Sequence, residues 1–402
     1  MARILVIAYT NYAFDGRVKR HAEALAERGD EVDVLSLAGE HEGMLNGVNV
    51  IGLRMPRYRG ASRSSYVRSY LRFFAAASWM AVRLSLKHRY NVAVVCTMPD
   101  AAVLCAIPTR LAGTRILLDI HDTMPELYSD KFGGRRGAFG ARILKMEERV
   151  CAGRADVVLA VHDLHRRRLI AAGIPAEKIR VVMNVSDPAV FRLGQHRQPN
   201  AGNFNLICHG TITHRLGLDL AIEAVAIARN RIDGLRLIVI GSGDYHAEAK
   251  RLVARMNLEE HVRFEQPVTT ERLPELLQRA HAGLVPNRAS SATHLMLPVK
   301  LLDYAALGIP TIAARLRTIE YYFGTEALRL FEPGEPATLA AAIEDLYHNP
   351  ALRLELVSKA HRVVERIGWA KQRAEYYRAI DSLLLPTPMD TTHRTDADRA
   401  AI

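Results

Sequence analysis

Residues 282–314 read AGLVPNRASSATHLMLPVKLLDYAALGIPTIAA. Two short apolar runs, residues 283–285 and 309–313, have the length and branching of buried parallel strands. Between them, Pro298 can begin a helix over residues 299–307, which Gly308 would cap and Pro310 would end. The stretch therefore predicts a strand, a polar loop, a helix and a strand. In an open α/β sheet such a loop lies at the carboxyl edge, where ligands bind.

Two charged side chains mark the start of this predicted helix. Lys300 and Asp303 are three residues apart, so they share one helix face. At a helix N-terminus the cation would meet a phosphate, and the carboxylate would accept hydrogen bonds from a ribose. An ordinary surface pair explains the same spacing, and the two interpretations remain open at this point.

Length and composition indicate a soluble protein of two domains. The chain has 402 residues, with 49% hydrophobic and 24% charged residues, and no apolar run reaches the roughly 18 residues of a membrane span. It opens on an apolar strand without a cleavage site. Its four cysteines lack metal or redox spacing; they are Cys96, Cys105, Cys151 and Cys208. We therefore expect a cytoplasmic protein with reduced cysteines.

Positive charge gathers in the first half of the chain. The net charge is +11, and residues 1–190 contain 28 Lys and Arg against 19 Asp and Glu. This favours an anionic partner, although a solubilising surface explains it equally well. Residues 54–90 interleave arginines with aromatic side chains, which suits a helix at a membrane interface or a helix packed under a sheet. No nucleic-acid-binding motif is present, so we expect no nucleic acid.

Two further sites follow predicted strands in the first half. Gly16 lies in the loop Asp15-Gly16-Arg17-Val18, where a glycine permits close backbone approach or only a turn. His121 and Asp122 follow an apolar strand and are competent for proton transfer near neutral pH. A histidine that caps a strand end is the alternative. A Ser-His-Asp hydrolase is excluded because no G-x-S-x-G segment is present.

Several segments together resemble glycosyltransferase family 4. Residues 297–314 are similar to its donor-site pattern P-x-K-l-x-E-Y, with Asp303 at the position of the Glu that binds the nucleotide ribose. The family's usual second Glu, eight positions earlier, is Leu295 here. Thr293, His294 or the loop backbone would then have to compensate for it.

The resemblance extends to both halves of the chain and implies further roles. Residues 15–18 are similar to a D-x-R-V loop whose glycine, here Gly16, approaches the donor diphosphate from the opposite domain. Residues 209–225 are similar to a segment with a diphosphate-clamping cation, for which Arg215 is the candidate. His121 and Asp122 would lie near the reacting sugar. The complete set of donor-site candidates is Gly16, Gly210, Thr211, Arg215, Gly241, Asn287, Lys300 and Asp303.

The resemblance implies the GT-B fold, in which two doubly wound, Rossmann-like α/β domains face each other. We expect an acceptor-binding domain over residues 1–190 and a linker over 191–203. A donor-binding domain would span residues 204–368. A helix over residues 369–385 would return to the first domain, and residues 386–402 would form a disordered tail.

The implied activity is transfer of a sugar, with retention at the anomeric carbon, from a nucleotide-diphosphate-sugar donor to an acceptor hydroxyl. The acceptor would be a lipid-linked or polysaccharide precursor of the cell envelope, and no metal or other cofactor is expected. Peripheral contact with the inner membrane face is a further expectation, with four candidate arginines for acceptor or membrane: Arg57, Arg59, Arg63 and Arg68. Two alternatives remain, a non-catalytic nucleotide-sugar-binding protein and a non-hydrolysing nucleotide-sugar epimerase.

Overall fold

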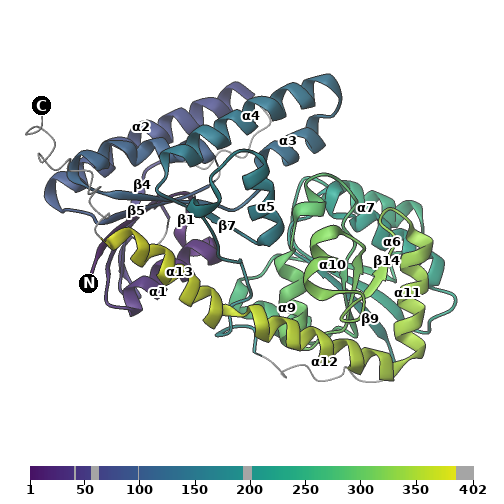
Figure 1. Ribbon diagram of the computed structural model, residues 1–402. Coiled ribbons are helices and arrows are strands. Elements are labelled where there is room, and N and C mark those ends of the chain that lie inside the picture. The colour runs from purple at the N-terminus through teal and green to yellow at the C-terminus, as the bar shows by residue number, and fades with distance from the viewer. Residues whose placement is uncertain (40–41, 56–62, 98, 193–201, 386–402) are drawn as a thin grey trace, which may run out of the picture.

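The computed structural model describes residues 1–39, 42–55, 63–97, 99–192 and 202–385. These residues form two α/β domains that face each other, each built on a parallel sheet with helices on both sides (Figure 1). The predicted fold class is therefore confirmed. The central strands of both sheets are almost entirely buried, which explains why they read as continuous apolar runs.

The first sheet has eight strands in the order β3-β4-β2-β1-β5-β6-β7-β8, and only β3 runs antiparallel to its neighbour. Its strands are β1 (Arg3–Asn11), β2 (Glu31–Leu37), β3 (Gly43–Leu45), β4 (Val48–Leu53), β5 (Val92–Cys96), β6 (Arg115–Ile120), β7 (Val157–Ala160) and β8 (Ile179–Val181). Its helices are α1 (Gly16–Glu27), α2 (Arg63–Lys87), α3 (Met124–Phe132), α4 (Gly134–Arg154) and α5 (Asp163–Ala171). Four 3-10 helices complete it: η1 (Tyr12–Phe14), η2 (Asp100–Cys105), η3 (Ile107–Ala112) and η4 (Ala176–Lys178).

The second sheet has six parallel strands in the order β11-β10-β9-β12-β13-β14. They are β9 (Phe204–His209), β10 (Leu235–Ile240), β11 (Val262–Glu265), β12 (Ala282–Val285), β13 (Thr311–Ala314) and β14 (Arg329–Phe331). The α-helices are α6 (Leu218–Ala228), α7 (His246–Arg255), α8 (Leu273–Leu277), α9 (Val299–Leu307), α10 (Arg317–Phe323) and α11 (Pro336–His348). The 3-10 helices are η5 (His214–Leu216), η6 (Thr270–Arg272) and η7 (Thr293–Leu295).

The stretch 282–314 folds as its proline and glycine positions predict. β12 and β13 are adjacent parallel strands, with Gly283 opposite Thr311. Pro298 is the N-cap of α9, and Gly308 ends this helix in the left-handed conformation with φ of 82°. The loop before α9 consequently lies at the carboxyl edge of the second sheet.

The start of α1 differs from the prediction, which placed Gly16 in a loop. The Asp15 side chain accepts a hydrogen bond from the Val18 amide at 3.1 Å, so Asp15 is the N-cap and Gly16 is already the first helical residue. Because Asp15 caps the helix, α1 starts at Gly16, two residues earlier than the apolar pattern indicates.

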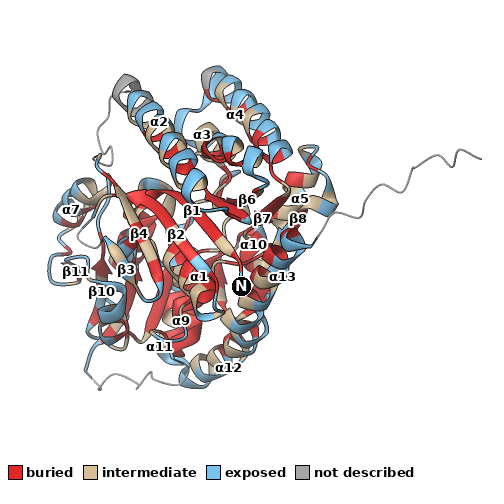
Figure 2. Cartoon of the chain, turned by 90° about the vertical axis from the view of Figure 1, so that its left-hand side faces the viewer, coloured by how far each residue is buried: buried red, intermediate tan, exposed pale blue. Residues whose placement is uncertain are grey.

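α2 is buried on one side, as expected for a helix packed under a sheet, and exposed on the other. Phe73 is fully buried beneath the first sheet, where its ring meets Tyr9 edge-on at 4.9 Å, whereas Trp79 is exposed. Figure 2 shows this division between buried and exposed sides. Within the described ranges, no helix is both long and apolar enough to cross a membrane.

The last two helices connect the domains. α12 (Pro350–Ile367) packs on the second domain, and α13 (Trp369–Leu384) runs back to the first, as the yellow ribbon in Figure 1 shows. Tyr376 and Ile380 of α13 are buried in the same core as Ile4 and Val94 of the first sheet. Most of the expected linker (193–201) and the whole expected tail (386–402) lie outside the described residues.

Candidate active site

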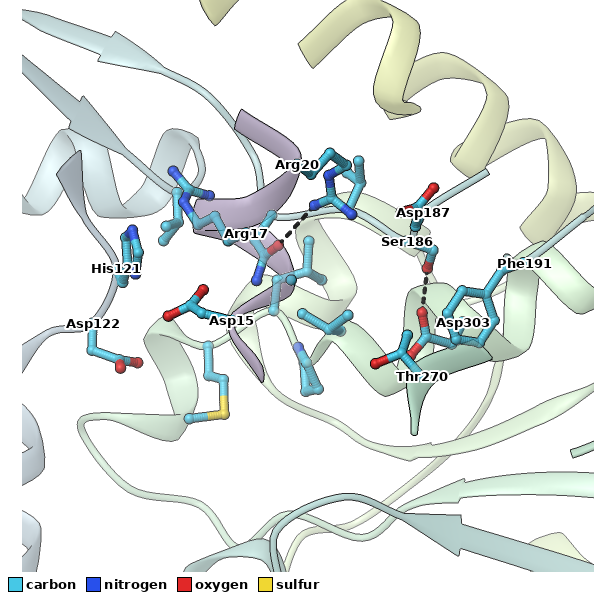
Figure 3. Close-up of a pocket in the computed structure, with 18 of the residues that line it drawn as sticks. Asp15, Arg17, Arg20, His121, Asp122, Ser186, Asp187, Phe191, Thr270 and Asp303 are labelled. Carbon is cyan, nitrogen blue, oxygen red and sulfur yellow. Dashed lines mark hydrogen bonds between the residues drawn. The ribbon is translucent and has the colours of Figure 1, made fainter. Parts of the chain in front are cut away.

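A cleft of about 750 Å³ lies between the two domains. Four predicted site residues line it: Gly16, His121, Asp122 and Asp303. Figure 3 shows His121 and Asp122 at one end and Asp303 at the other, with Asp15, Arg17 and Arg20 between them. The first-domain wall comes from the start of α1 and the residues after β6. The second-domain wall comes from the loop before α9 and from α9 itself.

A buried carboxylate organises the first-domain wall. Asp119 of β6 receives two hydrogen bonds from Arg17, from Nη2 at 2.6 Å and from Nε at 3.0 Å. The Nε2 atom of His121 lies 3.0 Å from Asp119 Oδ2. Burial alone would raise the pKa of Asp119, but Arg17 and His121 hold it well below its usual range. Since an ionised carboxylate only accepts, Nε2 of His121 carries the proton, and Nδ1 is the acceptor in the neutral ring.

Two arginines of α1 face the cleft, and the sequence analysis did not single out either one. Arg17 leaves its buried Nη1 atom without a hydrogen-bond partner among the described residues. Arg20 donates from Nη2 to Asn184 Oδ1 at 3.1 Å and lies 4.8 Å above the Trp369 ring. Burial lowers the pKa of Arg20 to about 10, so it remains a cation at neutral pH. Both side chains could meet an anionic group of a bound molecule.

Asp303 is buried on the opposite wall and is held from both domains. Its Oδ1 accepts a hydrogen bond from Ser186 Oγ at 2.6 Å, and its Oδ2 lies 3.4 Å from His209 Nε2. Ser186 belongs to the segment that leaves the first sheet after β8. Burial lowers the pKa of His209, while the charge on Asp303 opposes this shift. A carboxylate has about four acceptor positions, so Asp303 can still bind hydroxyl groups.

Lys300 points to the carboxyl end of β9. Its Nζ lies 4.0 Å from Cys208 Sγ, and its Cε would be 3.9 Å from a Cβ placed on Gly210. Gly241 has φ of +150°, and a Cβ there would collide with the carbonyl oxygen of Gly210. The loops after β9 and β10 therefore meet next to Lys300. Lys300, Gly210 and Gly241 do not line the cleft. His209, adjacent to Gly210 in sequence, does.

The remaining donor-site candidates lie outside the cleft wall. Thr211 is exposed in the loop after β9. Arg215 leaves its buried Nη1 atom unpartnered within the described structure, and its carbonyl accepts from the amide of Arg288 at 3.1 Å. Arg288, which the sequence analysis missed, pairs with Asp219. Asn287 is fully buried with Nδ2 3.8 Å from Met296 Sδ, so it packs inside the loop rather than facing the cleft.

Leu295, at the position of the family's second Glu, lies on the cleft wall. Its carbonyl oxygen accepts a hydrogen bond from His162 Nε2 at 2.8 Å. The Nδ1 atom of the same ring accepts from the His165 amide at 3.0 Å, so His162 is neutral with its proton on Nε2. Burial lowers the pKa of His162, which favours this neutral form.

Further contacts join the domains beside the cleft. The Asp130 carboxylate of α3 accepts from Ser291 Oγ at 2.9 Å and from the Ala292 amide at 3.1 Å. The Tyr322 hydroxyl of α10 donates to Asp163 Oδ2 at 2.8 Å. The loop before α9 is therefore held against α3, and α10 is held against α5.

The candidate acceptor or membrane arginines are only partly described. Arg57 and Arg59 lie outside the described residues, and Arg63 is the first residue of α2. Arg68 is exposed on α2. It does not line the cleft.

Cys96, Asp119 and His121 bring three potential ligand atoms within 4.8 Å of one another, the one such cluster in the described part of the chain. Asp119 is already neutralised by Arg17, and burial raises the pKa of Cys96 well above its usual value. A thiol that keeps its proton and a carboxylate paired with arginine are poor ligands for a divalent cation. The donor set therefore does not fit a metal.

Two protein-family models match the chain, one in each domain. Residues 16–184 match the glycosyl transferase 4-like domain, and residues 203–349 match the glycosyl transferases group 1 family. Among curated proteins, the amylovoran biosynthesis glycosyltransferase AmsK of Erwinia amylovora is 27% identical over 212 residues, 52% of each chain. The chain thus matches about half the length of this relative. Phosphatidyl-myo-inositol mannosyltransferase of Mycobacterium leprae is 25% identical over 92% of this chain and 95% of that protein.

Solved structures share the fold over nearly the whole chain. Anabaena Alr3699/HepE, solved in complex with UDP, has a TM-score of 0.70 and 17% identity, covering 94% of this chain and 100% of its own. Sucrose-phosphate synthase from Thermosynechococcus elongatus has a TM-score of 0.75 and 18% identity, covering 95% of this chain and 99% of its own.

Proposed function

Because the chain belongs to glycosyltransferase family 4 and has the GT-B fold, we propose that it transfers a sugar from a nucleotide-diphosphate-sugar donor to an acceptor hydroxyl. The observation that carries this proposal is the cleft between the domains. Asp303 faces it from the second domain, and His121 and Asp122 face it from the first. A donor and an acceptor bound on opposite walls would meet there.

The second domain would hold the donor. Lys300, beside the loops that Gly210 and Gly241 form, would neutralise charge on the departing diphosphate. Asp303 would accept hydrogen bonds from the ribose while Ser186 keeps its carboxylate in place. Gly16, at the N-terminus of α1, would present backbone amides to the diphosphate from the first domain. UDP in the HepE structure supports a nucleotide in such a site.

The first domain would hold the acceptor, and His121 would act on it or on the reacting sugar. With its proton on Nε2, the ring offers Nδ1 to a hydroxyl group. We assign retention at the anomeric carbon from family membership. A lipid-linked or polysaccharide precursor at an anionic membrane surface is the proposed acceptor, supported by the names of the amylovoran and phosphatidyl-myo-inositol relatives.

No metal enters this proposal. The Cys96, Asp119 and His121 cluster does not fit one, and the donor diphosphate would meet Lys300 and helix-terminal amides instead. Transfer should therefore persist in EDTA.

Sugar transfer by the purified protein tests the proposal. UDP-, GDP-, ADP- and dTDP-sugars are each incubated with polyprenyl-diphosphate-linked saccharides, and nucleoside diphosphate release is measured. NMR of the glycosylated product gives its anomeric configuration. We expect one nucleotide class to be active, with an α-linked donor giving an α-linked product.

Asp303→Asn should lower kcat/KM at least tenfold because the carboxylate charge is lost from the ribose contact. Asp233→Asn, at an exposed position of the same domain, is the matched control and should behave like the wild type. Nucleotide binding without turnover would favour the non-catalytic alternative. Interconversion of nucleotide sugars without any acceptor would favour the epimerase.

A further inference from the structure

α4 carries a stripe of exposed apolar side chains along its outer face. Phe139, Ile143, Met146 and Val150 follow one another at spacings of four, three and four residues, which aligns them along the helix. Phe139 is 67% exposed and Met146 71%. The first domain is packed against other residues of α4, so this stripe has no partner in the described structure.

α2 carries a second stripe of the same kind. Leu71, Trp79, Val82 and Leu86 are exposed on the face opposite the buried Phe73. Trp79 is 60% exposed and Leu86 83%. Spacings of eight, three and four residues again place these side chains on one line.

Both helices lie on the same side of the first sheet. Each packs on η2, through a hydrogen bond from the Ala101 amide to Glu147 Oε1 at 3.2 Å and from Cys105 Sγ to the Phe74 carbonyl at 3.7 Å. Figures 1 and 2 agree that α2 and α4 stand on this side, and Figure 2 shows exposed residues along both helices. We name the eight exposed apolar side chains of the two stripes the α2–α4 face.

The charges around the α2–α4 face are positive. Residues 63–87 contain five Lys and Arg and no acidic residue, and residues 134–154 contain six Lys and Arg and two acidic residues. Both acids are directed inward, since Glu147 binds the Ala101 amide and Glu148 pairs with Arg168. Exposed cations next to the stripes include Arg72, Arg142 and Lys145.

This combination selects one occupant. A second copy of the chain would bring two surfaces of equal positive charge together, which opposes association. An anionic bilayer instead offers phosphates to the cations and a headgroup boundary to Trp79 and the aliphatic side chains. We propose that the α2–α4 face is a docking surface for a bilayer of anionic phospholipid, with both helices lying in its interface.

This inference extends the proposed function, on which it rests for the lipid-linked acceptor. It keeps the membrane contact within the predicted 54–90 segment, on α2, and adds α4, which was not anticipated. Docking through the first domain would hold the acceptor wall of the cleft close to a membrane that contains the acceptor.

Co-sedimentation with vesicles tests the proposal on the full chain. We expect binding to phosphatidylglycerol vesicles at low salt, and at least tenfold weaker binding to phosphatidylcholine vesicles. The triple variant Phe139→Ser/Ile143→Ser/Met146→Ser, called the Ser variant below, should weaken binding to phosphatidylglycerol at least tenfold. Arg72→Gln/Arg142→Gln/Lys145→Gln should weaken it on the order of a hundredfold, at about fivefold for each charge. Leu354→Ser, at an exposed apolar position on α12, should have no effect.

Trp79 provides an independent readout. Its fluorescence should shift to shorter wavelength when phosphatidylglycerol vesicles are added, and the shift should be absent in Trp79→Phe. Equal binding to both vesicle types, undiminished binding of the Ser variant, or no binding at all would overturn the proposal. So would a wild-type dimer in light scattering that the Ser variant loses, because the occupant would then be a second copy.

The outcome is separable from that of the proposed function. Stabilisation by nucleoside diphosphates, measured without vesicles, should be the same for the wild type and the Ser variant. If it is present while vesicle binding fails, only the docking surface is refuted.

Discussion

At the scale of single residues, Asp119 shows how one buried side chain arranges a cleft wall. It is fully buried, it neutralises Arg17, and it fixes the tautomer of His121. We regard Asp119 and Arg17 as positioning residues for His121. Their pairing spans 102 residues of sequence, so no local pattern could predict it.

The Arg17–Asp119 pair can be measured with a double-mutant cycle. Arg17→Met and Asp119→Asn should each destabilise the fold by about 3–5 kcal/mol, because each leaves a buried group without its partner. The double variant should lose far less than the sum of the two. Urea unfolding measures all three, and additive losses would contradict the pairing.

Gly241 tests the close approach of the loops beside Lys300. Gly241→Ala should destabilise the second domain by roughly 1–3 kcal/mol and weaken nucleotide binding, since its Cβ would collide with the Gly210 carbonyl. Gly324→Ala is the matched control, because Gly324 also has positive φ (+65°) but open space around it. Equal effects on nucleotide binding would show that the contact with Gly210 is irrelevant.

At the scale of elements, the helix-start and helix-stop residues Pro298 and Gly308 predicted α9 over the residues that it occupies. α1 began earlier than predicted because the Asp15 cap was not recognised. The sequence analysis did not single out α4 or its apolar stripe, because the spacing of Phe139, Ile143 and Met146 fits an ordinary core face equally well. Only the three-dimensional packing shows that this face points outward.

α5 links to the loop before α9 through a histidine whose protonation should affect stability. Burial lowers the pKa of His162 in the folded protein below its ordinary value of 6.5. At pH values between the folded-state pKa and 6.5, the unfolded chain therefore binds more protons than the folded chain. The free energy of unfolding should therefore rise with pH in this interval, and stability should be lost as pH falls below about 6.5. Urea unfolding between pH 5 and 8 measures this slope.

His162→Gln should reduce that slope by up to about 1.4 kcal/mol per pH unit. It should not abolish the slope, because burial also lowers the pKa of His21, His165 and His209. His88→Gln, at an exposed position after α2, serves as the control. An unchanged slope in His162→Gln would show that His162 does not contribute to the pH dependence of the free energy of unfolding.

At the scale of the whole molecule, the sequence predicted two facing domains but not how they touch. The contacts of Ser186 with Asp303, His162 with Leu295 and Asp130 with the 291–292 loop each join residues more than 100 positions apart. No pattern within either segment indicates that the two partners of such a contact meet. The position of Leu295 on the cleft wall was anticipated only through the family pattern.

Asp130 is a residue whose removal should mainly affect the arrangement of the two domains. Asp130→Ala should increase the radius of gyration measured by small-angle X-ray scattering, because two hydrogen bonds between the domains are lost. Its exposed position should limit the change in unfolding free energy to about 0.5 kcal/mol. Asp233→Ala should change neither quantity. An unchanged radius would mean that other contacts hold the domains together without Asp130.

The central claim is a nucleotide-sugar site formed at Lys300 and Asp303, and thermal stabilisation by UDP, GDP, ADP and dTDP tests it most directly. A nucleotide at 100 times its dissociation constant should stabilise the wild type by about 2.7 kcal/mol. One nucleoside diphosphate should raise the Tm of the wild type and of Asp233→Asn, but not that of Lys300→Ala or Asp303→Asn. If none raises the Tm of the wild type, or if the site variants respond as the wild type does, the donor site is not where this account places it.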